Sequence, residues 1–429
     1  MAITGADEPS FRRLVPTLLV VVASCVSGSV PSARPAAGTA PELITLRRDP
    51  EIRIGLAVGA AQVRVGGNGV VVVNEPDGTR VTTIPPGEVW QVSPVGQRLA
   101  LVSPGGWVSP SLDAVALAAA DPAIPLQING KPYRGVAELL RDRTGITVVN
   151  RLGVEAYLQG VVSAEMGRRS SSEQAALEAQ AVVSRTFAVR YPGRRKAQGF
   201  DLSAGVSDQV YGGVARETPE GNAAVAATRG LVLTYNGAPV EAFFYSTCGG
   251  RTADGIEVFR GTPQPYLRSI ADQAENGIAY CSISPRYRWH EEWSDHSLRA
   301  TLERNLPAVA GVRGEDIRLV RDIRVARRTP SGRVDQLAIA LGGPEIKVDG
   351  LAIRQVLRPS SGELLRSNAF TLAATGSGGR VTHLSVDGMG AGHGVGMCQW
   401  GAVGRARAGQ GFQQILAAYF PGTRVGRRY

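Results

Sequence analysis

Short runs of β-branched residues, each closed by a turn sequence, fill the chain over residues 50–149. Val70–Val73, for example, lies between Gly66–Gly69 and the turn sequence Pro76–Gly78. Short strands broken by glycine, asparagine and proline are typical of a β-rich domain. Gly and Pro number 53 and 26 in 429 residues, which excludes a helical bundle or a coiled coil. We therefore expect a β-rich N-terminal part, and it contains no convincing catalytic cluster.

The strongest helical signal follows this part, at residues 173–189. Four residues there are spaced four, three and four apart: Leu177, Ala181, Ser184 and Ala188. This spacing places them on one face of a helix of about four turns, and the small residues among them allow close packing. Ser170–Ser172 offer N-caps, and Pro192-Gly193 ends the helix. Strands followed by such a helix predict an α+β fold, with further strands at 332–341 and 380–386 and a short helix at 296–306.

The N-terminus predicts export. Arg12 and Arg13 precede an apolar run, Leu14–Ala23, which is too short for a spanning helix and fits a secretory signal. Val22–Cys25 resembles a lipobox, in which Cys25 is acylated after cleavage; the alternative is an ordinary signal peptide with an incidental cysteine. We expect a signal peptide over 1–25, a linker over 26–49, and a lipid-anchored protein of the cell envelope.

Charge and residue counts narrow the function classes. Lys and Arg number 47 against 37 Asp and Glu, a net charge of +10 that is spread thinly and does not predict nucleic-acid binding. This positive charge mildly favours association with an anionic cell envelope. Four Cys are too few for a disulfide scaffold, and with four His they leave little material for a multi-metal enzyme.

Glu165 is the candidate catalytic acid. It lies between Ala164 and Met166, after the apolar pair Val161-Val162. A carboxyl group at such a junction can be partly desolvated, which raises its pKa and suits a general acid. The local sequence also fits a surface glutamate in a loop.

Several sequence blocks, in their order along the chain, resemble the stage II sporulation protein D family (SpoIID/LytB). The resemblance runs from about Pro132 to Val425 and makes residues 150–429 the family's catalytic core, with an insertion around 285–350. In this resemblance, Glu165 matches the acidic residue of the family. The blocks are Asn150–Met166, Ala179–Ala181, Arg185-Thr186, Asp208–Gly213, Phe243–Gly250, Pro265–Leu267, Gly392–Met397 and Gln399.

Three positions depart from the family pattern. Gly167 stands where the family usually has proline, and the loop Arg168–Ser172 is polar and slightly long. Cys398 stands where the family often has serine. The first two bear on the placement of Glu165, not on its identity as the matching residue.

The resemblance implies a lytic transglycosylase that cuts peptidoglycan glycan strands, preferably without stem peptides, to 1,6-anhydro-muramyl products. Glu165 would act as general acid and then as general base. No motif ties a second carboxylate to it: Glu155 lies ten residues earlier, and Asp201 and Asp208 lie in later loops. The chemistry needs no cofactor. The alternatives are a LytB-type enhancer of a cell-wall amidase and a wall-binding scaffold, neither of which cleaves glycan.

Six further residues are candidates for substrate binding. Five of them have an ordinary structural role as the alternative: an ion pair for the arginine, packing for the tyrosine, a strand end for the Ser-Thr pair and loop hydrogen bonds for the histidine. The glutamine is a saccharide contact, and the glycine-rich frame of the histidine allows close backbone approach. These residues are Arg185, Tyr211, Ser246, Thr247, His393 and Gln399.

Cysteines outside the signal peptide allow two arrangements. In an exported protein Cys248 and Cys281 flank one segment, and we expect them to form a disulfide that closes a loop of 33 residues. Such a loop contributes on the order of 3–4 kcal/mol. Cys398 then stays free. The alternative is a zinc site using the three cysteines or His393, which no CxxC or HxxxH spacing supports. His290 and His296 fit surface or packing positions.

Overall fold

The computed structural model describes residues 48–313, 316–343 and 345–429. The predicted signal peptide, Cys25 and all but the end of the predicted linker lie outside these residues. Within them, no helix is both long and apolar enough to cross a membrane.

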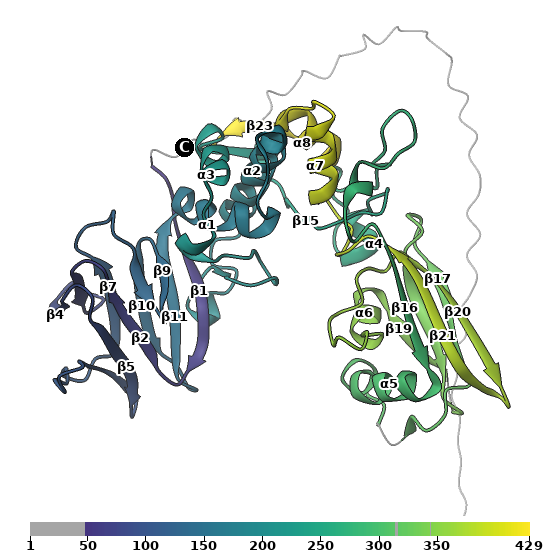
Figure 1. The fold of residues 1–429 in the computed structure, drawn as a ribbon, viewed down its shortest axis with the longest axis horizontal. Coiled ribbons are helices and arrows are strands. Elements are labelled where there is room, and N and C mark those ends of the chain that lie inside the picture. Colours follow the sequence, from purple (N-terminus) through teal and green to yellow (C-terminus); the bar gives the residue numbers. More distant parts are fainter. Residues whose placement is uncertain (1–47, 314–315, 344) are drawn as a thin grey trace, which may run out of the picture. The chain divides into compact units, whose positions relative to one another are not determined.

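Two sheets form the N-terminal part of the molecule (Figure 1). A seven-stranded sheet has the order β12-β1-β11-β10-β7-β3-β4, and a five-stranded sheet has the order β6-β5-β2-β8-β9. Alternate residues such as Ile52 and Ile54 are buried in a core that both sheets share. The strands are β1 (Glu51–Ala60), β2 (Val63–Gly67), β3 (Val71–Asn74), β4 (Arg80–Ile84), β5 (Val89–Val95), β6 (Arg98–Val102), β7 (Ala114–Ala119), β8 (Leu126–Ile128), β9 (Lys131–Tyr133), β10 (Val136–Arg141), β11 (Ile146–Gly153) and β12 (Leu202–Ser203).

Three helices continue the same core. Strand β11 leads directly into α1 (Val154–Met166), which packs on α2 (Gln174–Arg190) and α3 (Pro219–Ala227). The helix predicted at 173–189 is confirmed as α2. Its buried alanines let the helices approach closely, and at Gly160 of α1 a Cβ atom would lie 2.6 Å from the ring of Tyr211.

The C-terminal end of the chain returns to these helices. Strand β22 (Met397–Cys398) pairs in parallel with β15 (Phe244–Tyr245), and β23 (Arg424–Arg427) pairs with β13 (Leu231–Tyr235). Segments about 150 residues apart therefore meet beside α2. The other elements here are β14 (Ala238–Pro239), α4 (Gly255–Phe259), the 3₁₀ turn η4 (Tyr280–Ile283), α7 (Gln399–Arg407) and α8 (Phe412–Tyr419).

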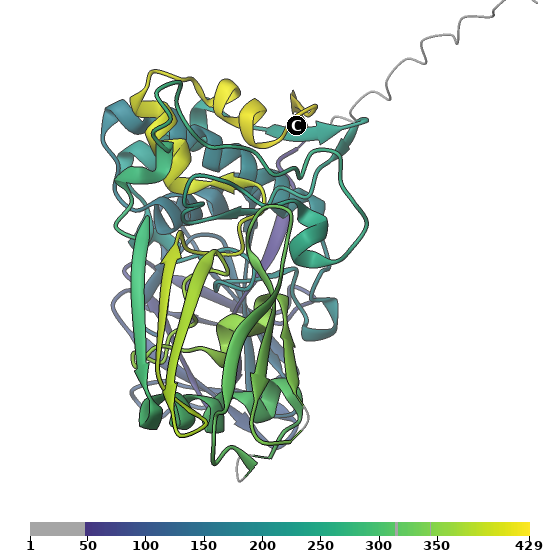
Figure 2. The same cartoon turned by 90° about the vertical axis from the view of Figure 1, so that its right-hand side faces the viewer.

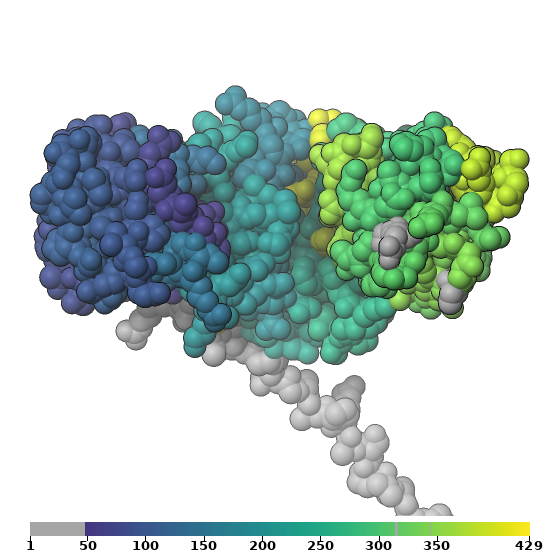
Figure 3. Space-filling view, turned by 90° about the horizontal axis from the view of Figure 1, so that it is seen from below, coloured from purple at the N-terminus to yellow at the C-terminus, as the bar shows by residue number. Residues whose placement is uncertain are grey.

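A second hydrophobic core, built by residues between Trp289 and Val386, has its own sheets. Their orders are β16-β21-β20 and β17-β18-β19, and Figures 2 and 3 show this part in green to yellow. The predicted short helix lies within α5, the strand predicted at 332–341 contains β18, and the strand predicted at 380–386 lies within β21. The α+β class is confirmed. The elements are β16 (Arg288–Ser294), α5 (Asp295–Ala310), β17 (Asp322–Arg328), β18 (Val334–Ala340), β19 (Ile346–Asp349), α6 (Ile353–Val356), β20 (Phe370–Ser377) and β21 (Arg380–Met389).

Candidate active site

Glu165 lies in the last turn of α1, where the helix ends at Gly167. Gly167 has a φ of 70°, a conformation that glycine adopts readily and that proline cannot adopt. The departure from the family's usual proline therefore accompanies a different backbone at the end of this helix. Glu165 as a whole residue is partly exposed, whereas its carboxyl group is largely buried.

Two hydrogen bonds hold the carboxyl group of Glu165. Its Oε1 accepts from the backbone N–H of Val210 at 2.6 Å, and its Oε2 accepts from Nε2 of Gln399 at 3.4 Å. Burial raises the pKa of Glu165, and the two hydrogen bonds offset this only in part. No ion pair joins Glu165 to another residue in the part of the chain that the structure describes, so its carboxylate has no neighbouring cation to stabilise it.

Gln399 is the first residue of α7 and reaches Glu165 from 234 positions away in the sequence. Its Nε2 also lies 3.4 Å from Oε1 of Gln180 on α2, and Gln180 in turn donates to Ser184. The structure thus brings together two of the residues that the sequence singles out, Glu165 and Gln399. It fixes them against α2 through a third polar side chain, Gln180, which the sequence predicted only as part of a family block.

Arg185 belongs to a different cluster. Its side chain is fully buried, and its Nε and Nη2 donate to the two carboxylate oxygens of Glu155, each at 2.8 Å. Burial by itself would raise the pKa of Glu155, but the hydrogen bonds and charge of Arg185 outweigh it and lower the pKa. Further bonds run from Arg185 to the carbonyls of Val225 and Leu231. Of the two roles weighed for Arg185, the contacts are those of the structural ion pair.

The other two carboxylates near Glu165 in sequence are also engaged. Asp201 accepts from the backbone N–H groups of Arg53 at 2.9 Å and Gly193 at 2.6 Å. Asp208 is buried and pairs with Arg195 at 2.5 Å and Arg194 at 3.3 Å. Each of these acids therefore has structural partners, whereas Glu165 has no charged partner among residues 48–313, 316–343 and 345–429.

Tyr211 is buried between two other tyrosines. Its ring centroid lies 5.1 Å from that of Tyr157 and 6.0 Å from that of Tyr133, and its hydroxyl donates to Asn150 Oδ1 at 2.8 Å. These contacts correspond to the packing alternative. Because Tyr211 is buried, its ring has no exposed face on which a sugar could stack. Its neighbour Val210 provides the backbone N–H that holds Glu165.

Ser246 and Thr247 follow β15 and lie near the start of α7. The carbonyl of Ser246 accepts from the backbone N–H of Trp400 at 3.0 Å, whereas Thr247 is buried and its hydroxyl lies 2.8 Å from that of Ser284. Of the pair, only Ser246 keeps partial exposure. Their binding roles remain predictions.

Both ring nitrogens of His393 have backbone partners, one in strand β15 and one in the loop of His393 itself. Nε2 donates to the carbonyl of Phe244 at 2.9 Å, and Nδ1 accepts from the N–H of Val395 at 3.1 Å. Burial lowers the pKa of His393 to about 4, so the ring is neutral near neutral pH. This arrangement matches the structural alternative, a histidine whose ring nitrogens are satisfied by the backbone.

Trp400 and Arg169 were not singled out by the sequence. The guanidinium carbon of Arg169 lies 4.5 Å from the centroid of the Trp400 ring, and Trp400 directly follows Gln399. Arg169 comes four residues after Glu165 and belongs to the polar loop that departs from the family pattern. The Gln-Trp pair and this polar loop were the available signals, but only the fold shows that the two side chains stack.

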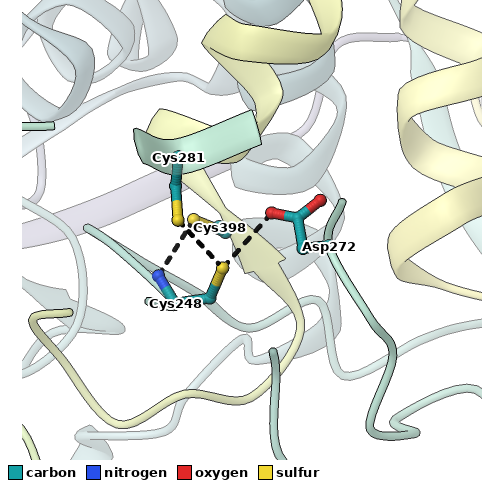
Figure 4. Close-up of side chains that lie close together, drawn as sticks. All are labelled: Cys248, Asp272, Cys281 and Cys398. Atoms are coloured by element: carbon teal, nitrogen blue, oxygen red, sulfur yellow. Dashed lines mark hydrogen bonds between the residues drawn. The ribbon is translucent and has the colours of Figure 1, made fainter. Parts of the chain in front are cut away.

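Cys248, Cys281 and Cys398 converge with Asp272 in the interior (Figure 4). The sulfurs of Cys248 and Cys281 lie 3.3 Å apart, well beyond the bond length of about 2.05 Å, and all three thiols are free. The structure therefore differs from the predicted disulfide, because a third sulfur and a carboxylate occupy the same small volume. Cys398 is a free thiol, as predicted, but it lies beside Cys248, Cys281 and Asp272 in the interior.

A cavity of about 230 Å³ lies elsewhere, lined by residues that include Glu241, Phe243 and Phe259. None of its lining residues is a candidate site residue. Glu165 is the centre of the candidate site because of the chemistry of its carboxyl group, and not because of the size of a cavity.

Comparison with known proteins identifies the family of this chain. The family described as Stage II sporulation protein matches residues 142–235, a range that contains Glu165. The stage II sporulation protein D of Bacillus amyloliquefaciens is 30% identical over 298 residues, which are 66% of this chain and 77% of the relative. The chain belongs to the stage II sporulation protein D family. The Bacillus subtilis member with the same name is 29% identical over 322 residues, 70% of this chain and 84% of the relative.

Two further matches bear on this SpoIID-family chain. A protein named amidase enhancer from Bacillus subtilis is 27% identical over 291 residues, 62% of this chain and 40% of the relative. A domain of unknown function (DUF8618) matches residues 279–396, which include the whole second core.

Proposed function

We propose that this SpoIID-family protein is an exported, lipid-anchored lytic transglycosylase of the cell envelope. Its substrate is the glycan strand of peptidoglycan, preferably stripped of stem peptides. The proposal depends on one observation about Glu165. Its carboxyl group is largely buried, has a raised pKa and has no cation partner among the residues that the structure describes. Such a group holds its proton more readily than an exposed glutamate and can deliver it to a substrate.

The reaction has two proton transfers. Protonated Glu165 gives its proton to the glycosidic oxygen as the bond between that oxygen and C1 of the muramyl sugar breaks. The resulting carboxylate then takes the proton from the C6 hydroxyl of the same sugar while O6 bonds to C1. The product is a 1,6-anhydro-muramyl end, water is not consumed, and Glu165 returns to its protonated form.

One carboxyl group suffices for this sequence, whereas most glycoside hydrolases need two. The engagement of Glu155, Asp201 and Asp208 by structural partners supports the single-acid reaction. Gln399 would orient the carboxyl group, since its amide donates to the oxygen opposite the one that Val210 holds.

The second candidate is a non-catalytic enhancer of a cell-wall amidase. It is favoured by the 27% identity to a protein named amidase enhancer. In this case the chain binds peptidoglycan and stimulates a partner, and a wall-binding scaffold would bind without stimulation. Neither role needs a proton on Glu165.

The test is digestion of purified glycan strands lacking stem peptides, with mass spectrometry of the products. We expect anhydro-muramyl ends from the wild type and a loss of activity of about 10²–10⁴-fold in Glu165→Gln. Glu178→Gln is the matched control, because Glu178 is a half-buried glutamate whose pKa burial also raises but which does not contact Gln399 or Val210. Stimulation of an amidase that survives in Glu165→Gln, without anhydro products from the wild type, would favour the enhancer.

A further inference from the structure

We propose that Cys248, Cys281, Cys398 and Asp272 form a structural zinc site. Their ligand atoms all lie within 4.8 Å of one another. Cys248 Sγ is 3.3 Å from both Cys281 Sγ and Asp272 Oδ2. With zinc bonds of about 2.3 Å to sulfur and about 2.1 Å to oxygen, the S–O and S–S edges of a tetrahedral site are about 3.6 and about 3.8 Å. The four atoms therefore need only small shifts to surround one ion.

The surroundings already orient these ligands. Asp272 is fully buried; its Oδ1 accepts from Nε of Arg405 at 3.0 Å, and its Oδ2 accepts from the hydroxyl of Tyr419 at 2.8 Å. Such outer partners are typical of carboxylates that bind metals. Gly401 allows Asp272 to come this close to α7, because a Cβ atom at position 401 would lie only 2.2 Å from Asp272 Oδ2.

Backbone N–H groups point at two of the sulfurs. Cys398 Sγ accepts from the N–H groups of Cys248 at 3.1 Å and Gly401 at 3.2 Å. Cys248 Sγ accepts from the N–H of Gly250 at 3.3 Å. Hydrogen bonds of this kind stabilise negative charge on sulfur, and thiolate is the form that binds a metal.

A metal explains more of the cluster than a disulfide does. A bond between Cys248 and Cys281 would use two sulfurs and would not account for the third sulfur, of Cys398, and the Asp272 carboxylate gathered within 4.8 Å of them. Figure 4 shows the side chains from four separate segments directed toward one another. A buried set of three cysteine sulfurs and one carboxylate, four ligands in all, favours zinc over the harder ions magnesium and calcium.

The site would fix the beginning of α7. Cys398 is the N-cap of this helix, and the next residue, Gln399, contacts Glu165. The metal would join this point to η4, to the segment after β15 and to the loop of Asp272. The ion is thereby placed to hold Gln399 in position. Only this consequence rests on the proposed function; the metal site itself does not.

The experiment uses the full chain without a histidine tag, purified after expression with zinc in the medium. Metal content is measured by mass spectrometry of the elements, and free thiols are counted after denaturation. We expect about one zinc ion per chain in the wild type and in Glu165→Gln, and near none in Cys398→Ser and Asp272→Asn. Cys25→Ser is the matched control and should keep the ion, because this cysteine is not in the cluster.

Cobalt gives a second readout that does not depend on the variants folding. Wild-type protein stripped with a chelator and loaded with Co²⁺ should show intense absorption from thiolate-to-cobalt charge transfer and the visible bands of a tetrahedral ion. A bond between Cys248 and Cys281 in the purified chain, a wild type without metal that gives no such cobalt spectrum, or full zinc content in Cys398→Ser would overturn the proposal. Zinc binding that persists while glycan cleavage is absent would reject only the proposed function.

Discussion

The two ends of helix α1 place the same type of side chain in opposite surroundings. At its start, Glu155 is buried against Arg185 and also accepts from the hydroxyl of Tyr429 at 2.6 Å, and its pKa is lowered. At its end, Glu165 is largely buried beside neutral amides, and its pKa is raised. Burial acts on both groups in the same direction, so the presence or absence of a cation decides the outcome. One end is a structural ion pair and the other is suited to giving up a proton.

The largest effect is expected from breaking the ion pair. Arg185→Met should lower the free energy of unfolding by about 3–5 kcal/mol, because it leaves the carboxylate of Glu155 buried without its partner. Denaturant unfolding measures this loss. Arg190→Met, near the exposed end of the same helix, should change stability by under about 0.5 kcal/mol. Equal effects of the two substitutions would show that Arg185 contributes no more than a surface arginine.

Removing the amide that contacts Glu165 should give a smaller, catalytic effect. Activity should fall as the pH rises through the raised pKa of Glu165, because the proton to be donated is then lost. Gln399→Ala removes a hydrogen bond that lowers this pKa, so the fall should move to higher pH, with about tenfold lower activity at the optimum. The pH dependence of glycan cleavage measures both changes. Gln413→Ala, at an exposed position of α8, should leave the profile unchanged.

The smallest expected effect is the change in stability on Glu165→Gln, which is opposite in sign to the change at the other end of α1. The raised pKa of Glu165 means that its contribution is fully present below its unfolded pKa and is lost as the pH rises through its folded pKa. Glu165→Gln should therefore gain on the order of 1 kcal/mol above that pKa and nothing in acid.

Glu155→Gln is the counterpart. Its lowered pKa provides stability above the unfolded pKa that is lost as the pH falls through the folded one. This variant should be less stable than the wild type at neutral pH, with a deficit that shrinks in acid. Thermal unfolding at a series of pH values compares the two, and the same sign for both variants would remove the contrast between the helix ends.

The sequence predicted local structure better than long-range contacts. The spacing of Leu177, Ala181 and Ser184 predicted α2 because helical periodicity is a local property. The resemblance selected Glu165, but the contact with Gln399 spans 234 residues and depends on how β22 pairs with β15. No local pattern contains that pairing.

The cysteines and arginines illustrate the same limit. The ligand atoms of the cysteine cluster come from four segments, so no CxxC spacing reveals them, and the prediction joined only the two cysteines that flank one segment. The role of Arg185 was open because the sequence fits both substrate binding and a structural ion pair. The buried bidentate contact to Glu155 distinguishes them.

The most direct measurement is the titration of both glutamates in one protein. The side-chain carboxyl carbons are labelled with ¹³C and followed by NMR, with the two signals assigned from Glu155→Gln and Glu165→Gln. We expect Glu165 to titrate above the ordinary pKa of a glutamate and Glu155 to titrate below it. Equal pKa values, or the reverse order, would contradict the claim that the end of α1 carries the proton-donating group.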